Sequence, residues 1–162
     1  ITATHDQQMN MLSVEKQIND QRDDNMMHLS YVVSGTDFTR AGEASGDVKR
    51  KLKTMGADPG AIRKVSIAMY EGEINMVIHA HGGEIDVYIT EDQVRMVLTD
   101  HGPGIADIEK AMQAGYSTAP DNIRTLGFGA GMGLPNMKKY SDSMDIRTKL
   151  GEGTVVEMIV NL

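Results

Sequence analysis

The sequence predicts an α/β (α+β) two-layer sandwich, with a mixed, mostly antiparallel sheet and helices on one face. Two observations lead to this fold class. Short segments of alternating apolar residues occur in pairs around tight turns, and two longer segments with helical spacing follow the first strand. The order strand, helix, helix, hairpin, loop helices, hairpin is typical of a sheet covered on one side. A chain of 162 residues is long enough for one domain with a sizeable core.

Composition excludes several classes of function. There is no cysteine, which rules out disulfides, thiolate metal sites and cysteine nucleophiles. The 16 basic and 23 acidic residues give a formal charge of −7, which argues against nucleic-acid binding. No apolar run approaches the roughly 18 residues of a membrane span, and the first ten residues do not resemble a signal peptide. We therefore expect a cytoplasmic protein that binds neither nucleic acid nor membrane.

The chain divides into a polar N-terminal arm or helix, residues 1–27, and a folded domain, residues 28–162. The arm has only a thin apolar stripe (Met9, Leu12, Val14 and Ile18). From His28 the alternation of apolar residues predicts a strand, which ends at Ser34 and Gly35.

Two helices are expected next. The first begins at Thr36 or Asp37 and runs to about Met55, although Gly42 and Gly46 weaken it. The second starts after an Asp58-Pro59 cap and continues to about residue 79.

The remaining elements are two hairpins separated by loops and short helices. The segments EIDVYIT and QVRMVLTD predict the first hairpin, and SMDIRTKL and GTVVEMIV the second. Short helices are expected over residues 107–113 and 134–141. The many methionines are interpreted as adaptable core filling.

A polar stripe on the second helix is the first candidate site. Glu71, Asn75 and His79 are spaced by four residues and so share one face of the helix, beside an apolar stripe that includes Tyr70 and Ile74. An amide oxygen suits Mg²⁺, and a carboxylate one turn away can accept a proton. An ordinary amphipathic helix would give the same pattern. A metal site at His79 and His81 is a poor match, because no third ligand is in register.

Two glycine-rich segments follow strand ends or precede helices. The motif DHGPGI, residues 100–105, places a carboxylate at the end of a strand, where it could accept a hydrogen bond from an exocyclic amine; a plain tight turn is the alternative. The motif GFGAGMGL, residues 127–134, runs into a helix and could hold a polyphosphate with backbone N–H groups. It lacks the Lys-Ser or Lys-Thr of a Walker motif, and the alternative is a flexible linker. The turn GEGT, residues 151–154, is by itself only a hairpin turn.

In this order, the four blocks make residues 28–162 resemble the GHKL ATPase superfamily. The spacing E-x-x-x-N-x-x-x-H and the stretches DHGPGIADIEKAMQAGYSTA and GAGMGLPNMKKYSD are similar to bacterial anti-sigma serine/threonine kinases and stressosome-type switch kinases. Sensor histidine kinases usually have a Lys or Arg where this chain has Ile78, and no H-box is present. Gly72 and the segment APDNIRT, which lengthens the lid, depart from the family pattern.

The resemblance implies a Bergerat ATP-binding fold and a role for each block. Glu71 matches the catalytic carboxylate, Asn75 the Mg²⁺ ligand, and Asp100 the aspartate that binds adenine. The glycine-rich lid would close over the phosphates. The residues implied to bind ATP are Asn75, His79, Asp100, Gly102, Gly104, Ile105, Arg124, Gly127, Gly129, Gly131, Gly133, Leu134 and Thr154. Lys138 and Lys139 are weaker candidates for a phosphate contact.

The function implied is an ATP-dependent, Mg²⁺-dependent protein serine/threonine kinase of the anti-sigma regulatory factor type. Its substrate would be a small regulatory protein resembling an anti-sigma antagonist, and a sigma factor is a second expected partner. Dimers are common in the family, so the choice between monomer and homodimer stays open. Two alternatives also stay open: a nucleotide-gated module that captures a partner with little catalysis, and the catalytic half of a split histidine kinase.

Overall fold

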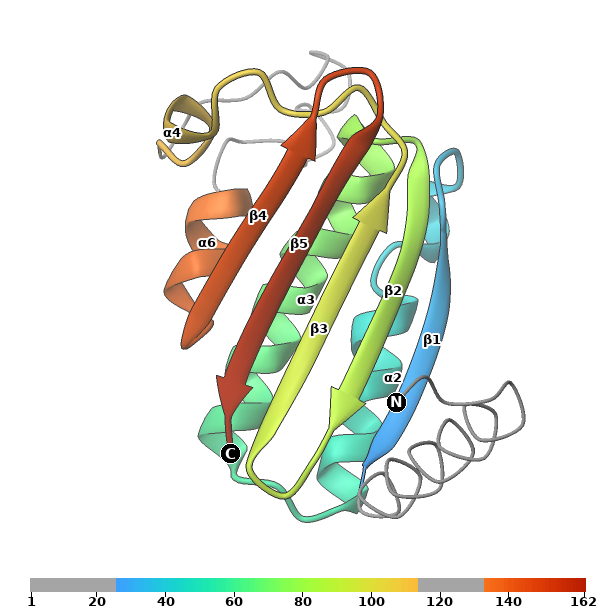
Figure 1. Cartoon of the computed structure of the whole chain (residues 1–162). Coiled ribbons are helices and arrows are strands. Elements are labelled where there is room, and N and C mark those ends of the chain that lie inside the picture. Colours follow the sequence, from blue (N-terminus) through green and yellow to red (C-terminus); the bar gives the residue numbers. More distant parts are fainter. Residues whose placement is uncertain (1–25, 114–132) are drawn as a thin grey trace, which may run out of the picture.

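A computed structural model describes residues 26–113 and 133–162 and confirms the predicted fold class (Figure 1). Five strands form one sheet in the order β1-β2-β3-β5-β4, and the helices lie on one face of it. The strands are β1 (Met27–Ser34), β2 (Gly82–Ile89), β3 (Gln93–Asp100), β4 (Ser143–Lys149) and β5 (Gly153–Asn161). The helices are the 3-10 turn η1 (Phe38–Arg40), α2 (Glu43–Thr54), α3 (Pro59–His79), α4 (Ile108–Ala111) and α6 (Gly133–Lys139).

Every strand pairing in the described residues is antiparallel, where the sequence predicted a mixed sheet. The connection from β1 to β2 explains the difference. One crossover helix would return the chain to the start of β1 and give a parallel neighbour. Here two helices, α2 and α3, lie between the strands, so the chain re-enters the sheet at the end where β1 finishes.

The first predicted helix is interrupted at Gly42. Asp37 caps η1 by accepting a hydrogen bond from the Thr39 amide at 3.0 Å, and α2 begins only after Gly42, which has a φ of 97°. A residue with a side chain is strained in this left-handed region, so glycine suits the break. The second helix starts as predicted, because the Asp58 carboxylate accepts from the Ala61 amide at 3.0 Å and Pro59 occupies the first turn.

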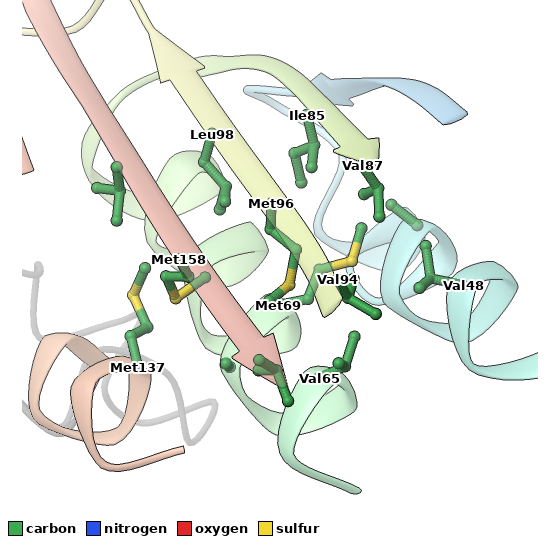
Figure 2. Packing of buried hydrophobic residues seen from close by; sticks show 14 of the residues in the cluster. Val48, Val65, Met69, Ile85, Val87, Val94, Met96, Leu98, Met137 and Met158 are labelled. Atoms are coloured by element: carbon green, nitrogen blue, oxygen red, sulfur yellow. The ribbon is translucent and has the colours of Figure 1, made fainter. Parts of the chain in front are cut away.

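The core lies between the helical layer and the covered face of the sheet (Figure 2). Methionines supply much of it: Met69, Met96 and Met158 are fully buried, and Met137 of α6 is 1% exposed. Their unbranched side chains fill the uneven space between helices and sheet. The interpretation of methionine as core filling is confirmed for these residues, whereas Met55 is half exposed.

The predicted arm, residues 1–27, lies outside the described residues except at its end, where Met27 begins β1. Among the helices that the structure describes, none has both the length and the apolar character needed to cross a bilayer.

Candidate active site

Three of the four motifs meet at one end of the sheet, where β3 finishes and β5 begins (Figure 1). The antiparallel register pairs Asp100 directly with Thr154, so residues 54 positions apart become neighbours. The loop that follows Asp100 then runs against the last turn of α3. A Cβ atom on Gly102 would lie 2.7 Å from the Cα of Ala80, which shows how closely these two segments pack.

The Asp100 carboxylate is held in one orientation by backbone amides. Its Oδ1 accepts hydrogen bonds from the Gly102 amide at 2.9 Å and from the Thr154 amide at 3.2 Å. Both bonds end on Oδ1. Among the described residues no donor is recorded for Oδ2, so this oxygen can accept a hydrogen bond from a ligand. A fixed, half-buried carboxylate oxygen suits an exocyclic amine of a base.

Threonine hydroxyls extend this polar cluster. Thr154 is only 6% exposed, and its hydroxyl lies 2.9 Å from that of Thr148 on β4. The Thr148 hydroxyl in turn accepts from the Ile105 amide at 2.9 Å. Sequence reasoning selected Ile105 and Thr154 but missed Thr148. The signal that could have found it is its position opposite Thr154 in the second predicted hairpin.

Glycines at this end of the sheet allow approaches that side chains would prevent. A Cβ on Gly153 would lie 2.1 Å from the carbonyl oxygen of Asp100, and one on Gly104 would lie 2.7 Å from that of Lys149. Both glycines also have positive φ angles, 129° and 80°. Close packing against the protein's own backbone therefore explains the glycines at positions 102 and 104, and their role in binding ATP stays a prediction.

The second part of the site is the face of α3 that meets α6. The Asn136 side chain donates to Oε1 of Glu71 at 3.4 Å, and the Asn75 amide nitrogen lies 3.6 Å from the sulfur of Met137. A Cβ on Gly133 would lie 2.6 Å from the Asn75 Oδ1 atom. The first residue of α6 therefore touches the candidate Mg²⁺ ligand directly. Asn136 is a second residue that sequence reasoning missed.

Gly72, the departure from the family pattern, also has a packing reason. A Cβ there would lie 2.3 Å from the Leu98 Cδ2 atom and 3.1 Å from the Met137 methyl group. The absence of a side chain lets β3 and α6 approach α3 between Glu71 and Asn75.

The expected apolar stripe of α3 needs one correction, because Tyr70 is 40% exposed while Gly72 and Met76 are buried.

Glu73 is the most buried charged residue in the described part of the chain, at 2% exposure, and it was not selected from the sequence. Its carboxylate accepts from the amides of Gly42, Ala44 and Ser45 at 2.8, 3.3 and 3.0 Å. It thus caps the start of α2, where Gly42 offers no side-chain cap. The spacing of residues in the sequence does not reveal this contact, because the start of α2 precedes Glu73 by about 30 residues.

His79 ends the polar stripe of α3 near the Gly102 loop. Burial lowers the pKa of its imidazole, because desolvation penalises the charged form. Among the described residues, no group of three or more His, Asp or Glu side chains could hold a metal ion.

The residues present fit a nucleotide with its Mg²⁺, but not a metal held by protein alone. Asn75 contributes one hard oxygen, and Mg²⁺ in such sites takes most of its ligands from phosphates and water. Gly133 has no side chain where it packs against this amide, so the backbone at the start of α6 comes close to the Asn75 oxygen. Asn75 would hold the ion and Asp100 would hold the base.

The structure brings Glu71, Asn75, His79, Asp100, Gly102, Gly104, Ile105, Gly133, Leu134 and Thr154 to the same end of the molecule. Arg124, Gly127, Gly129 and Gly131 lie outside the described residues. The lysines proposed as weaker phosphate contacts are exposed, and the Lys139 ammonium lies 5.4 Å from the centre of the Tyr140 ring.

Known proteins resemble this chain in sequence. The model of the histidine kinase-like ATPase domain family matches residues 37–160. An anti-sigma F factor of Pasteuria penetrans is 36% identical over 105 residues, which cover 60% of this chain and 67% of that protein. The serine/threonine-protein kinase RsbT of Bacillus subtilis is 31% identical over 100 residues, covering 59% of this chain and 69% of that protein.

Two solved structures share the fold. The SiaB-SiaC complex of Pseudomonas aeruginosa aligns with a TM-score of 0.57 and 11% identity, covering 94% of this chain and 99% of that one. The RsbU and RsbW domains of Rv1364c from Mycobacterium tuberculosis align with a TM-score of 0.53 and 18% identity, covering 83% of this chain. This chain spans about a third (32%) of that protein's chain. At these identities the likeness concerns the fold alone.

Proposed function

Because the chain belongs to the family of histidine kinase-like ATPase domains, we propose that it binds ATP with Mg²⁺ and phosphorylates a serine or threonine of a small regulatory protein. One observation carries the proposal. The Asp100 carboxylate, fixed by two backbone amides, and the Glu71–Asn75 face of α3 lie at the same end of the fold. That arrangement supports a single site in which one carboxylate binds the base and the other accepts the proton of the substrate hydroxyl.

Each residue then has a defined task. Asp100 Oδ2 accepts a hydrogen bond from the adenine amino group, and Thr154 lines the same pocket. The Asn75 amide oxygen would hold Mg²⁺, and the bound ion would supply neutralisation of phosphate charge. Glu71 accepts the proton of the substrate hydroxyl as its oxygen bonds to the γ-phosphorus, while the bond between that phosphorus and the ADP oxygen breaks. Asn136 orients the Glu71 carboxylate.

Glu71→Gln separates binding from chemistry. The amide keeps the shape but cannot accept the proton, so we expect phosphoryl transfer to fall by about 10²- to 10⁴-fold. ATP affinity should change less than about twofold, since Glu71 has no task in binding the base. Titration with a fluorescent ATP analogue measures affinity, and transfer of label from [γ-³²P]ATP to an antagonist-like partner measures turnover. Full activity of the variant would remove Glu71 from the mechanism.

A nucleotide-gated binding module is the second candidate, favoured by the similarity to a protein named an anti-sigma F factor. In this case ATP changes the surface presented to the partner, and little phosphate is transferred. Size-exclusion chromatography with and without ATP distinguishes the two. Co-elution that depends on ATP, with no label on the partner, supports the module.

A split histidine kinase is the third possibility to test. Phosphohistidine is labile in acid whereas phosphoserine and phosphothreonine are stable, so acid treatment of the labelled partner decides between them. Label that survives acid supports the serine/threonine kinase.

A further inference from the structure

The helical layer contains a groove away from the end of the sheet that carries the candidate active site. A groove of about 510 Å³ lies between α2 and α3. Its floor is apolar and is formed by Ala57, Pro59, Ile62 and Ile67. Ile62 is 7% exposed, so the groove reaches down to the core. Its α3 residues come from the N-terminal half of that helix, whereas the candidate active site uses the C-terminal half.

The rim of this groove is basic on both sides. Lys49 and Lys53, one helical turn apart on α2, form one side, and Arg63 on α3 forms the other. All three side chains are exposed. None of the described residues that line the groove is acidic, so a positive rim surrounds an apolar floor on a chain with a formal charge of −7.

These cations differ from the other basic residues nearby. Arg50 and Lys51 both pair with Asp47, at 3.6 and 2.7 Å, and Lys64 pairs with Asp142 at 3.3 Å. Within residues 26–113 and 133–162, the side chains of Lys49, Lys53 and Arg63 form no ion pair. The basic residues beside the groove are therefore neutralised by described carboxylates, whereas those on its rim have no acidic partner in the described part of the chain.

We propose that this groove is a docking site for an acidic amphipathic helix of a partner protein. A helix has an apolar face that can lie on Ile62 and Ile67, and glutamates on its two flanks can then meet Lys53 and Arg63. Charge complementarity sets the orientation and speeds association. Three cations are few for nucleic acid, whose binding relies on many phosphate contacts. A concave floor is also a poor match to a lipid surface.

Docking here leaves the nucleotide site open. Arg63 and Asn75 are twelve residues apart on one helix, which corresponds to about 18 Å along its axis. A partner could therefore be held on α2 and α3 while ATP occupies the other end of α3. The groove does not depend on the proposed kinase activity, since neither its floor nor its rim includes Glu71, Asn75 or Asp100.

The test uses the whole chain and a synthetic peptide of about 15 residues, with leucines on one helical face and glutamates on both flanks. Two further peptides serve as controls: a scrambled one of identical composition, and one with lysine in place of glutamate. The charge-reversed variant is Lys53→Glu/Arg63→Glu. Its matched control is Arg147→Glu/Lys149→Glu, which makes the same change in charge at exposed cations of β4. Circular dichroism and ATP binding report on the fold of both variants.

We expect the acidic peptide to bind the natural chain, with an affinity that falls as salt rises, and to shift the amide NMR signals of Ala57, Ile62 and Ile67. Binding should weaken at least about tenfold in Lys53→Glu/Arg63→Glu and stay unchanged in the matched control. The proposal is overturned if the scrambled peptide binds equally well, if both variants bind alike, or if the acidic peptide does not bind. Stronger binding of phosphatidylserine vesicles or of single-stranded RNA at the same residues would overturn it too.

Loss of peptide binding and loss of nucleotide binding are separate results. A chain that binds ATP but not the peptide refutes the groove alone. A chain that binds the peptide but not ATP refutes the proposed kinase and leaves the groove in place.

Discussion

At the end of β3, two backbone amides hold the Asp100 carboxylate, at 2.9 and 3.2 Å. On α3, the Glu71 carboxylate meets a single side-chain amide among the described residues, that of Asn136 at 3.4 Å. The half of the site proposed to bind the base thus belongs to the sheet, whose register and close-packed glycines fix it. The half proposed to carry the chemistry contacts α6. The first half is therefore fixed by backbone contacts within the sheet, and the second by side-chain contacts between α3 and α6.

We expect the largest loss of stability when Gly153 is replaced, because this glycine lies in the half of the site that belongs to the sheet. A Cβ there lies 2.1 Å from the Asp100 carbonyl oxygen, and the φ of 129° disfavours a side chain. We expect Gly153→Ala to lower the free energy of unfolding by about 3 kcal/mol and to weaken ATP binding. Urea titration measures the first and fluorescence titration the second.

Gly151→Ala is the matched control for this variant. Gly151 also has a positive φ, 78°, but a Cβ there meets nothing within 4 Å. Gly151→Ala should lower the free energy of unfolding by only about 1 kcal/mol, the penalty for an alanine in the left-handed conformation. Equal losses in the two variants would mean that backbone conformation, and not close packing against Asp100, sets the requirement for glycine.

Two glutamates on α3 sharpen the comparison, since they are two residues apart and differ in their surroundings. Glu73 is buried and accepts from three amides at the start of α2. We expect Glu73→Ala to lower the free energy of unfolding by about 2 kcal/mol, because it leaves buried donors without a partner. Glu71→Ala should change it by less than about 0.5 kcal/mol while it stops phosphoryl transfer. Unfolding curves and transfer assays on both variants provide the check, and a reversed pattern contradicts the assignment.

Replacing Asn136 tests whether the function of Glu71 depends on its contact with α6. Asn136→Ala should reduce kcat by about tenfold and leave KM for ATP and stability nearly unchanged, since its task is to orient Glu71. Asn136→Asp removes the donor and places a second negative charge beside Glu71, so we expect kcat to fall at least as far as in Asn136→Ala, again with KM for ATP nearly unchanged. A merely structural role for Asn136 would lower stability and leave kcat unchanged. Lys138→Ala, on the exposed side of α6, is the control.

Local patterns predicted most of the fold, because alternation and caps act over a few residues. Asp58 and Pro59 start α3 as expected, and the β2–β3 hairpin has the predicted segments. The break at Gly42 was not predicted, since it depends on a carboxylate 31 residues away at Glu73. Likewise, the sequence indicated Asp100 and Thr154 but not Thr148 or Asn136. Those two become part of the site only through strand register and helix packing, which no local spacing encodes.

His79 offers the smallest and most specific test, at the junction of the two halves. Burial lowers the pKa of its imidazole in the folded chain below the ordinary value of 6.5. Between the lowered pKa and 6.5 the unfolded chain binds more protons than the folded one, so stability rises with pH through this window and is level above it. His79→Gln removes this difference in proton binding. The free energy of unfolding of the variant should therefore change less with pH than that of the natural chain, between neutral pH and the pH at which carboxylates begin to protonate. Urea titrations of both chains across this range measure the effect. An identical pH dependence would show that His79 is as solvated in the folded chain as in the unfolded one, and that the junction between the two halves is open to water.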